Sequence, residues 1–320
     1  MSSTSAPLVT IVGGSGFVGR YVAQAMAKRG WRVRVAVRRP NEAIFVRPYG
    51  VVGQVEPVQC NVRDDASMAR VIAGSDAVIY SVGVLFSSGK NTFMAVQAEG
   101  PARAARLAAE HGVDRFVLIS AIGADADSPA EYARTKAGGE AGVLAAMPEA
   151  IILRPSIVFG QEDQFFNRFA AMARLSPVLP VVGASTRFQP VWVQDVAEAT
   201  AKAAAGETAA GIYELGGPRI YSFRELMTLM LGVIRRRRLV VNIPFWAAHL
   251  QASVLQMLPN PPLTRDQVRL LGKDNVVAEG AKGFADLGIE PSTIESVVES
   301  YLYSYRPYGQ YTKLTEGQAK

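Results

Sequence analysis

Cysteine and histidine are almost missing from this chain. Its 320 residues include one cysteine, Cys60, and two histidines, His111 and His249. A single cysteine excludes an intrachain disulfide framework and is typical of a reducing compartment. Because the two histidines lie far apart in the sequence, His and Cys side chains cannot assemble a metal cluster, and we expect no bound metal.

Long apolar runs and targeting signals are also missing. No uncharged apolar stretch reaches the roughly 18 residues that a membrane-spanning helix needs. Residues 1–7 are small and polar, without the apolar core of a signal peptide or the arginines of a transit peptide. The sequence therefore predicts a cytoplasmic protein with a short flexible N-terminus.

The charge balance is moderately basic. The formal net charge is +6, and 49% of the residues are hydrophobic. The apolar fraction excludes disorder for most of the chain, and the charge suits an anionic cofactor or an acidic surface. No RNA- or DNA-binding motif accompanies it, so we expect no nucleic-acid partner.

The most informative stretch is LVTIVGGSGFVG, at 8–19. A β-prone apolar run ends in closely spaced glycines, and an amphipathic segment follows at once. Gly13 would permit a tight turn, Gly16 would leave room for a pyrophosphate, and Gly19 would let helix and strand pack closely. The free N–H groups and positive dipole end of the helix would face the phosphates. This pattern predicts a dinucleotide-binding βαβ unit.

Strand-like and helical segments then alternate along the chain. This alternation predicts an α/β fold, a Rossmann-like doubly wound parallel sheet with a smaller interleaved C-terminal substrate-type domain. We expect the nucleotide-binding domain at 8–160, with 188–215 contributing to it. The smaller region would span 161–305, and a tail would follow at 306–320.

Arg38 and Arg39 follow the predicted second strand, where NAD-selective folds carry an acidic residue that binds the ribose 2′-hydroxyl. A guanidinium group grips a 2′-phosphate that a carboxylate would repel. The two arginines therefore predict NADP(H) as the cofactor. The alternative is a pair of solvated surface charges.

Two later strand ends supply further candidate contacts with the cofactor. Asn61 and Val62, after the third strand, are placed to meet the adenine, although a turn asparagine before the helix 65–72 explains Asn61 nearly as well. Ser81, Val82 and Gly83 follow the fourth strand, where a glycine lets the backbone approach the cofactor.

Tyr132 and Lys136 lie four residues apart in a predicted helix, so both face one side. A nearby ammonium favours the phenolate, and we expect the pKa of Tyr132 to fall toward working pH. Tyr132 would then exchange a proton with a carbonyl or alcohol oxygen while Ser120 bonds the same oxygen. The alternative is a helix-surface pair. His111 is interpreted as a helix C-cap.

The glycine loop, Ser120, Tyr132 and Lys136 together resemble the short-chain dehydrogenase/reductase superfamily. The IILRPSIVFG stretch at 151–160 is similar to its extended branch. The segments GQEDQFFN at 160–167, QPVWVQDV at 189–196 and LTRDQV at 263–268 resemble the nucleotide-binding accessory subunits of respiratory complex I (39-kDa type). The resemblance covers residues 8–305, most specifically 148–196.

The resemblance implies a chain that holds NADP(H) largely structurally, with complex I subunits as partners. With no transit peptide, it implies a bacterial homologue, peripheral on the cytoplasmic face of the inner membrane. A free NADP(H)-dependent reductase acting through Tyr132 and Lys136 is the alternative, so enzymatic turnover is left open. The full predicted cofactor set is Gly13, Ser15, Gly16, Phe17, Val18, Gly19, Arg38, Arg39, Asn61, Val62, Ser81, Val82, Gly83, Ser120, Tyr132, Lys136, Pro155, Ile157 and Val158.

The second half of the chain is less regular. A helix is predicted at 163–175 with Phe165, Phe166 and Phe169 as core residues, and the prolines at 177–180 would break it. Ser222 and Ser292 are expected to cap two later helices, of which the second runs to about residue 302.

Arg235, Arg236, Arg237 and Arg238 form the sharpest charge run, and an apolar segment with Trp246 follows at 244–258. A basic cluster beside such a segment suits an anionic membrane surface or a hydrophobic partner. The alternative is a core helix with solvated arginines.

Overall fold

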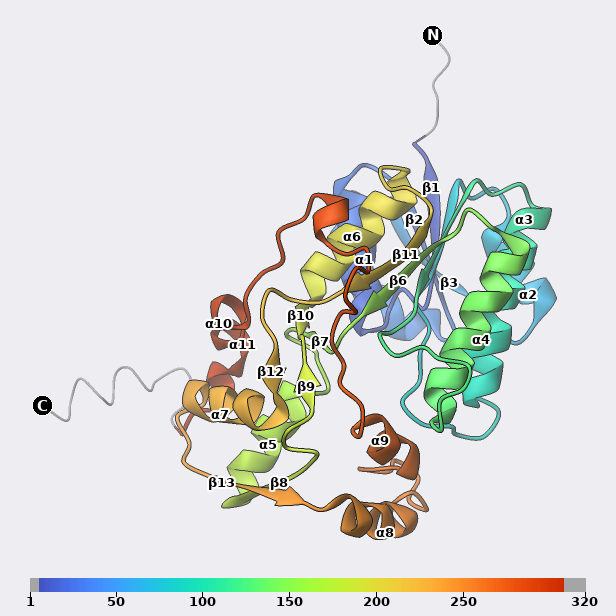
Figure 1. Ribbon diagram of the computed structural model, residues 1–320. Coiled ribbons are helices and arrows are strands. Elements are labelled where there is room, and N and C mark those ends of the chain that lie inside the picture. Colours follow the sequence, from blue (N-terminus) through green and yellow to red (C-terminus); the bar gives the residue numbers. More distant parts are fainter. Residues whose placement is uncertain (1–5, 308–320) are drawn as a thin grey trace, which may run out of the picture. The chain divides into compact units, whose positions relative to one another are not determined.

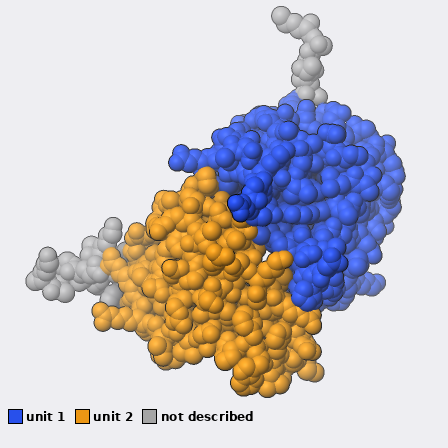
Figure 2. All heavy atoms as spheres, viewed as in Figure 1, with its two compact units in different colours: residues 1–155, 193–215, 278–290 blue, residues 156–192, 216–277, 291–320 orange. Residues whose placement is uncertain are grey.

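The computed structural model describes residues 6–307, and these residues fall into two units, coloured separately in Figure 2. The first unit holds residues 6–155, 193–215 and 278–290. The second unit holds residues 156–192, 216–277 and 291–307. Both units are therefore assembled from segments that alternate along the sequence.

The first unit contains a seven-stranded sheet whose neighbouring strands are all parallel, in the order β11-β6-β5-β4-β1-β2-β3 (Figure 1). Its strands are β1 (Leu8–Val12), β2 (Arg32–Val37), β3 (Val55–Gln59), β4 (Ala77–Tyr80), β5 (Arg115–Ile119), β6 (Ile151–Pro155) and β11 (Gly211–Leu215). The strand order reverses between β1 and β4. Ligands of such sheets bind beyond the carboxyl ends of the strands at this reversal.

Helices cover both faces of this sheet (Figure 1). They are α1 (Phe17–Lys28), α2 (Asp65–Ile72), α3 (Glu99–Glu110), α4 (Glu131–Ala146) and α6 (Val193–Ala205), with the 3₁₀ helices η1 (Pro40–Tyr49) and η3 (Ala285–Leu287) and the π-helix η2 (Met94–Ala98). α1 packs beside α6 on one face, and α2, α3 and α4 pack side by side on the other. This arrangement confirms the predicted Rossmann-like doubly wound fold.

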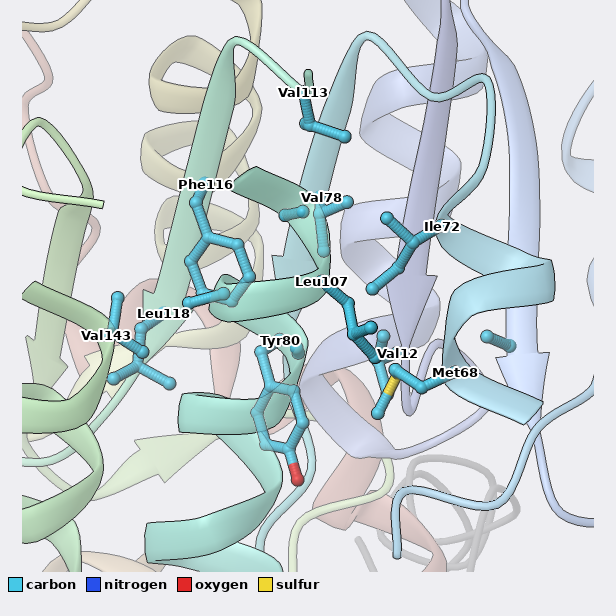
Figure 3. Close-up of a cluster of buried hydrophobic side chains, with 14 of the residues drawn as sticks. Val12, Met68, Ile72, Val78, Tyr80, Leu107, Val113, Phe116, Leu118 and Val143 are labelled. Carbon is cyan, nitrogen blue, oxygen red and sulfur yellow. The ribbon is translucent and has the colours of Figure 1, made fainter. Parts of the chain in front are cut away.

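The core on the α2–α3–α4 side is drawn in Figure 3. Ile72 of α2, Leu107 of α3 and Val143 of α4 meet Val78 and Phe116 of the sheet there, and all are buried. The expected helix end at His111 is confirmed, because His111 is the C-cap of α3.

The second unit holds only short two-stranded sheets among its helices. Its strands are β7 (Val158–Phe159), β8 (Val178–Val182), β9 (Arg187–Phe188), β10 (Val191–Trp192), β12 (Tyr221–Ser222) and β13 (Leu239–Ile243), paired as β10-β7, β12-β9 and β13-β8. Its helices are α5 (Phe166–Leu175), α7 (Phe223–Val233), α8 (Phe245–Leu255), α9 (Arg265–Leu270), α10 (Ile294–Val297), α11 (Glu299–Leu302) and the 3₁₀ helix η4 (Tyr303–Tyr305).

Aromatic rings fill the core of this unit. The centroid of the Phe165 ring lies 5.1 Å from that of Phe166, 5.6 Å from that of Phe169 and 5.5 Å from that of Phe223. These rings belong to the buried cluster around α5 and α7. The interpretation of the phenylalanines as core residues is confirmed.

The predicted helix break at 177–180 is confirmed, because α5 ends at Leu175, and residues 178–182 then form β8, since an edge strand accommodates a proline such as Pro180. Two other local predictions for the second unit were wrong. α5 begins at Phe166, since the Asp163 carboxylate accepts hydrogen bonds from the N–H groups of Phe165 and Asn167. The cap of α10 is Thr293 and not Ser292, because the Thr293 side chain accepts from the Ser296 N–H.

The expected extent of the smaller region, 161–305, also differs from the structure. Residues 278–290 return to the first unit. There the Ala278 N–H donates to Glu214 Oε2 at 2.8 Å, and Lys202 Nζ donates to the Leu287 carbonyl at 2.7 Å. Most of the predicted tail, 308–320, lies outside the described residues. Arg306 is buried in the second unit and donates to the Val233 carbonyl.

Candidate nucleotide-binding site

The glycine loop joins the carboxyl end of β1 to α1. The Gly13 N–H donates to the Ala36 carbonyl at 2.9 Å, and Gly13 has φ +84°, a conformation that favours glycine. A Cβ on Gly13 would lie 2.7 Å from Val82 Cγ2, and one on Gly19 would lie 2.4 Å from the Gly13 oxygen. The turn and the close packing of helix on loop therefore both require glycine.

The start of α1 presents backbone N–H groups. Gly16 is its N-cap, no side chain caps it, and its first turn carries no acidic residue. Gly16 is exposed, and Ser15, Phe17 and Val18 are half-buried. An uncapped N-terminus with an exposed glycine leaves donors and a positive dipole end for an anion, as a dinucleotide pyrophosphate requires.

The carboxyl end of β2 lies next to this loop, because the Ala36 carbonyl holds Gly13. Arg38 follows two residues later and is exposed. Arg39 is exposed as well, and its Nη1 lies 2.9 Å from Glu42 Oε1. Both arginines therefore follow β2, as predicted, and Arg39 forms an ion pair with the carboxylate of Glu42.

Arg20 was missed in the sequence analysis. Its guanidinium lies 4.7 Å from the centroid of the Phe45 ring, and its Nη2 donates to the Ser15 carbonyl at 3.2 Å. The sequence signal that could have identified Arg20 is its position directly after Gly19, one helical turn beyond Gly16. Arg20 adds positive charge beside the glycine loop.

At the end of β3, the alternative explanation fits better than an adenine contact. Asn61 Oδ1 accepts from the Arg63 N–H at 3.2 Å, the pattern of a turn asparagine. Val62 is 8% exposed and packs in the core with Met68. The side chain of Val62 is therefore committed to the core.

The end of β4 connects the glycine loop with α4. The Ser81 N–H donates to the Val12 carbonyl at 2.9 Å, and Val82 lies against Gly13. A Cβ on Gly83 would lie 3.9 Å from Lys136 Nζ. The structure thus brings Lys136 to the same strand ends as the glycine loop.

Lys136 and Tyr132 lie on one side of α4, as predicted. Lys136 is buried, its Nζ donates to the Ile119 carbonyl at 3.2 Å, and it lies 5.9 Å from the centroid of the Tyr132 ring. The Phe93 ring stands edge-on to Tyr132, with centroids 6.0 Å apart. The pair therefore sits against apolar surroundings and is not a solvated helix-surface pair.

The expected titration of Tyr132 was wrong. Burial raises the pKa of Tyr132 to about 12, because removal from water penalises the charged phenolate. Burial lowers the pKa of Lys136 to about 8, against the opposing charge of Glu140. Both shifts favour the neutral form of each side chain.

Ser120 is held in a buried polar network. It is 4% exposed, and its hydroxyl donates to Glu140 Oε1. The Arg154 guanidinium binds both Glu140 oxygens, at 2.9 and 2.6 Å, and approaches Glu214 at 3.5 Å. The Ser120 hydroxyl is thus engaged by a carboxylate, which does not support the predicted bond to a substrate oxygen.

The last three predicted cofactor residues are divided between the units. Pro155 ends β6 in the first unit, where its carbonyl accepts from the Ile122 N–H at 3.0 Å. Ile157 and Val158 belong to the second unit, and the Ile157 carbonyl accepts from the Val191 N–H. The predicted contact of these two residues with the cofactor therefore stays a prediction.

Two further features bear on function. Among residues 6–307, no group of three or more His, Cys, Asp or Glu side chains could hold a metal ion. Within the same part of the chain, no helix has the length and apolar character needed to cross a membrane.

Curated relatives match nearly the whole chain. It is 33% identical to NADH dehydrogenase [ubiquinone] 1 alpha subcomplex subunit 9, mitochondrial, of Arabidopsis thaliana, over 96% of this chain and 80% of the relative. It is 32% identical to the mitochondrial NADH-ubiquinone oxidoreductase 40 kDa subunit of Neurospora crassa, over 97% and 82%. It is also 32% identical to the ceramide reductase of Caulobacter vibrioides, over 76% of each.

Solved structures share the fold. The NADPH-dependent quinone oxidoreductase of Escherichia coli, solved with NADPH, superposes with a TM-score of 0.74 at 17% identity, covering 92% of this chain and 99% of that one. The profile of the NAD dependent epimerase/dehydratase family matches residues 9–216. The glycine cradle and this match support binding of a nicotinamide dinucleotide. The chain belongs to the NAD dependent epimerase/dehydratase family.

Proposed function

We propose that this chain is an accessory subunit of respiratory complex I, or a factor for its assembly or stability, and that it holds NADP(H) in a largely structural role. The observation that carries the proposal is identity of 32–33% to complex I subunits along 96–97% of the chain. The commitment of Ser120 to Glu140 supports a nucleotide that is held without turnover.

NADP(H) is favoured over NAD(H) by the charge at the end of β2. Arg38 and Arg39 stand there, and β2 carries no acidic side chain. A 2′-phosphate beside the glycine loop would meet guanidinium groups, with Arg20 on the neighbouring helix. In this proposal Lys136 binds the nicotinamide ribose.

The second candidate function is a free NADP(H)-dependent reductase. It is favoured by the position of Lys136 beside Gly83 with Tyr132 on the same helix face, and by the similarity to a ceramide reductase. The raised pKa of Tyr132 fits a proton donor, because the phenol keeps its proton at neutral pH. The engaged Ser120 weighs against it.

We further propose a location on the cytoplasmic face of a bacterial inner membrane, with complex I subunits as partners. The basic run Arg235–Arg238 and Trp246 would lie toward an anionic membrane surface. The net charge of +6 supports such a position.

The test is affinity purification of the tagged chain from its native membranes in mild detergent. We expect complex I subunits to co-elute, and NADP(H) to be released on denaturation. Recovery without any respiratory-chain subunit, together with NADPH oxidation by small carbonyl compounds, would establish the reductase instead.

A further inference from the structure

Helix α8 carries its large apolar side chains outward. Only Ala248 and Ala252 of this helix are buried, against Val182 and Val268. On the opposite side Trp246 is 74% exposed, Leu250 67% and Val254 66%. This inverts the usual pattern of a surface helix, in which the large apolar residues face the core. The alternative of a core helix is therefore wrong.

The outward apolar surface continues onto β13. Leu239 and Val241 are exposed on one face of this strand, and they pair with the exposed Val178 and Pro180 of β8. Ile243 shares that face by the two-residue period of a strand. It also lines an open groove of about 470 Å³ with Trp246, Ala247, Leu250, Gln251, Val254 and Leu255. We call the exposed side chains Leu239, Val241, Trp246, Leu250 and Val254 the apolar ledge.

The segment that carries the ledge has charge of one sign. Forty consecutive residues, 226–265, contain five arginines and not one aspartate or glutamate. Arg236 and Arg238 are tied to the fold, because they donate to the carbonyls of Tyr305 and Ala173. Arg235 and Arg237 are exposed. Within residues 226–238 the exposed charge is therefore carried by these two arginines.

The backbone at Arg235 adds an independent observation. Arg235 has φ +54° in the turn that ends α7, a left-handed position where glycine is the favourable residue. An arginine there costs stability that a glycine would not. The chain thus keeps a charged side chain four residues before Leu239 against the local conformational preference.

We propose that the apolar ledge lies in the interface of an anionic lipid bilayer, with Arg235 and Arg237 at the level of the phosphates. At 11 residues α8 is too short to cross a bilayer, so it would lie in the membrane plane. A tryptophan with an apolar body and one N–H donor suits this depth. The missing acidic side chains favour a surface of phosphates over a protein face of mixed charge.

This inference rests on the membrane location proposed above, but not on the nucleotide or on complex I. The experiment is vesicle flotation of the purified full chain with phosphatidylcholine alone and with added phosphatidylglycerol. We expect binding to the anionic vesicles that weakens with salt, and a blue shift of tryptophan emission that Trp246→Phe removes.

Two variants test the ledge and its charge separately. Trp246→Ser with Leu250→Ser should weaken binding by about tenfold or more, since two large apolar side chains no longer leave water. Arg235→Gly should weaken it by about fivefold while raising the melting temperature, because each arginine near an anionic surface contributes about that factor. Val51→Ser with Val52→Ser, at an exposed apolar site of the first unit, is the matched control.

Equal binding by these variants and the unaltered chain would overturn the proposal. A second pair of results would also overturn it: the unaltered chain binds no vesicle, and the Trp246→Ser, Leu250→Ser variant no longer co-purifies with complex I subunits. The ledge would then be a face that docks on protein. Vesicle binding without any co-purifying complex I subunit would instead contradict the proposed function and leave this inference standing.

Discussion

Among single residues, we propose that Arg38 and Arg39 decide which dinucleotide the glycine loop accepts. Replacing both by glutamate should lower NADPH affinity at least about tenfold more than NADH affinity, because two bidentate phosphate donors become repelling charges. Fluorescence titration with both nucleotides measures the difference. Arg32→Glu, at the exposed start of β2, is the control and should change neither affinity. Equal losses for the two nucleotides would contradict the 2′-phosphate role.

Lys136 should make stability depend on pH. Because burial lowers its pKa from 10.5 to about 8, the folded chain binds fewer protons than the unfolded chain between these values, and stability rises with pH there. Tyr132, with its pKa raised from 10.0 to about 12, binds more protons when folded, so it opposes the rise only above pH 10.0.

Urea unfolding without nucleotide measures this effect. From about pH 8 to pH 9.5 the unaltered chain should gain about 2 kcal/mol relative to Lys136→Met. The variant serves as the control, because all other titrating groups are common to both chains. Parallel pH profiles would show that Lys136 is solvated in the folded state.

The roles of some of these residues could be predicted from the sequence and those of others could not, for a physical reason. The roles of Gly13 and Gly19 follow from local spacing, and the structure places both as expected. The partner of Ser120 does not follow, because Glu140, itself bound by Arg154, reaches Ser120 only once the sheet and α4 have assembled. The direction of the Tyr132 pKa shift was missed for the same reason.

Among the elements, the predicted alternation of strands and helices in the first unit is confirmed. Apolar runs between turn signals mark a buried parallel strand, and β1 begins at Leu8, where the predicted βαβ stretch 8–19 begins. The segments missed are short and have little periodicity. α9 spans six residues, and its only strong signal is the capping box of Thr264 with Gln267.

The capping box of α7 gives a prediction at this scale. The Ser222 hydroxyl accepts from the Glu225 N–H, and Glu225 Oε2 accepts from the Ser222 N–H at 2.6 Å. Ser222→Ala should lower the free energy of unfolding by about 1 kcal/mol. Thr228→Ala, exposed on the same helix, should be neutral or slightly stabilising, and chemical denaturation compares the two. A smaller loss for Ser222→Ala than for Thr228→Ala would contradict the cap.

In the whole molecule, the chain passes between the two units at 155, 192, 215, 277 and 290. The sequence predicts that 188–215 contributes to the first unit, and the structure places 193–215 there. It gave no sign of the return at 278–290, a segment with little regular structure. That segment is held by hydrogen bonds to Glu214 and Lys202, contacts that no local pattern encodes.

This interleaving makes the predicted domain 8–160 an incomplete folding unit. A fragment of residues 1–160 lacks β11, which pairs with β6 along five residues, and α6, nine of whose 13 residues are buried. One face of its sheet would be left to α1 and η1. We therefore expect the fragment to bind a hydrophobic dye and to unfold without a cooperative transition.

The full chain is the control for this fragment and should unfold in a cooperative transition. NADPH at one hundred times its dissociation constant should raise the free energy of unfolding by about 2.7 kcal/mol. Adding residues 161–215 to the fragment restores β11 and α6, so that longer fragment should recover part of the nucleotide binding. Cooperative unfolding and full NADPH affinity of the 1–160 fragment would mean that α6 and β11 are dispensable. The sheet would then derive its stability from strands β1–β6 and helices α1–α4, and the returning segments would serve the second unit instead.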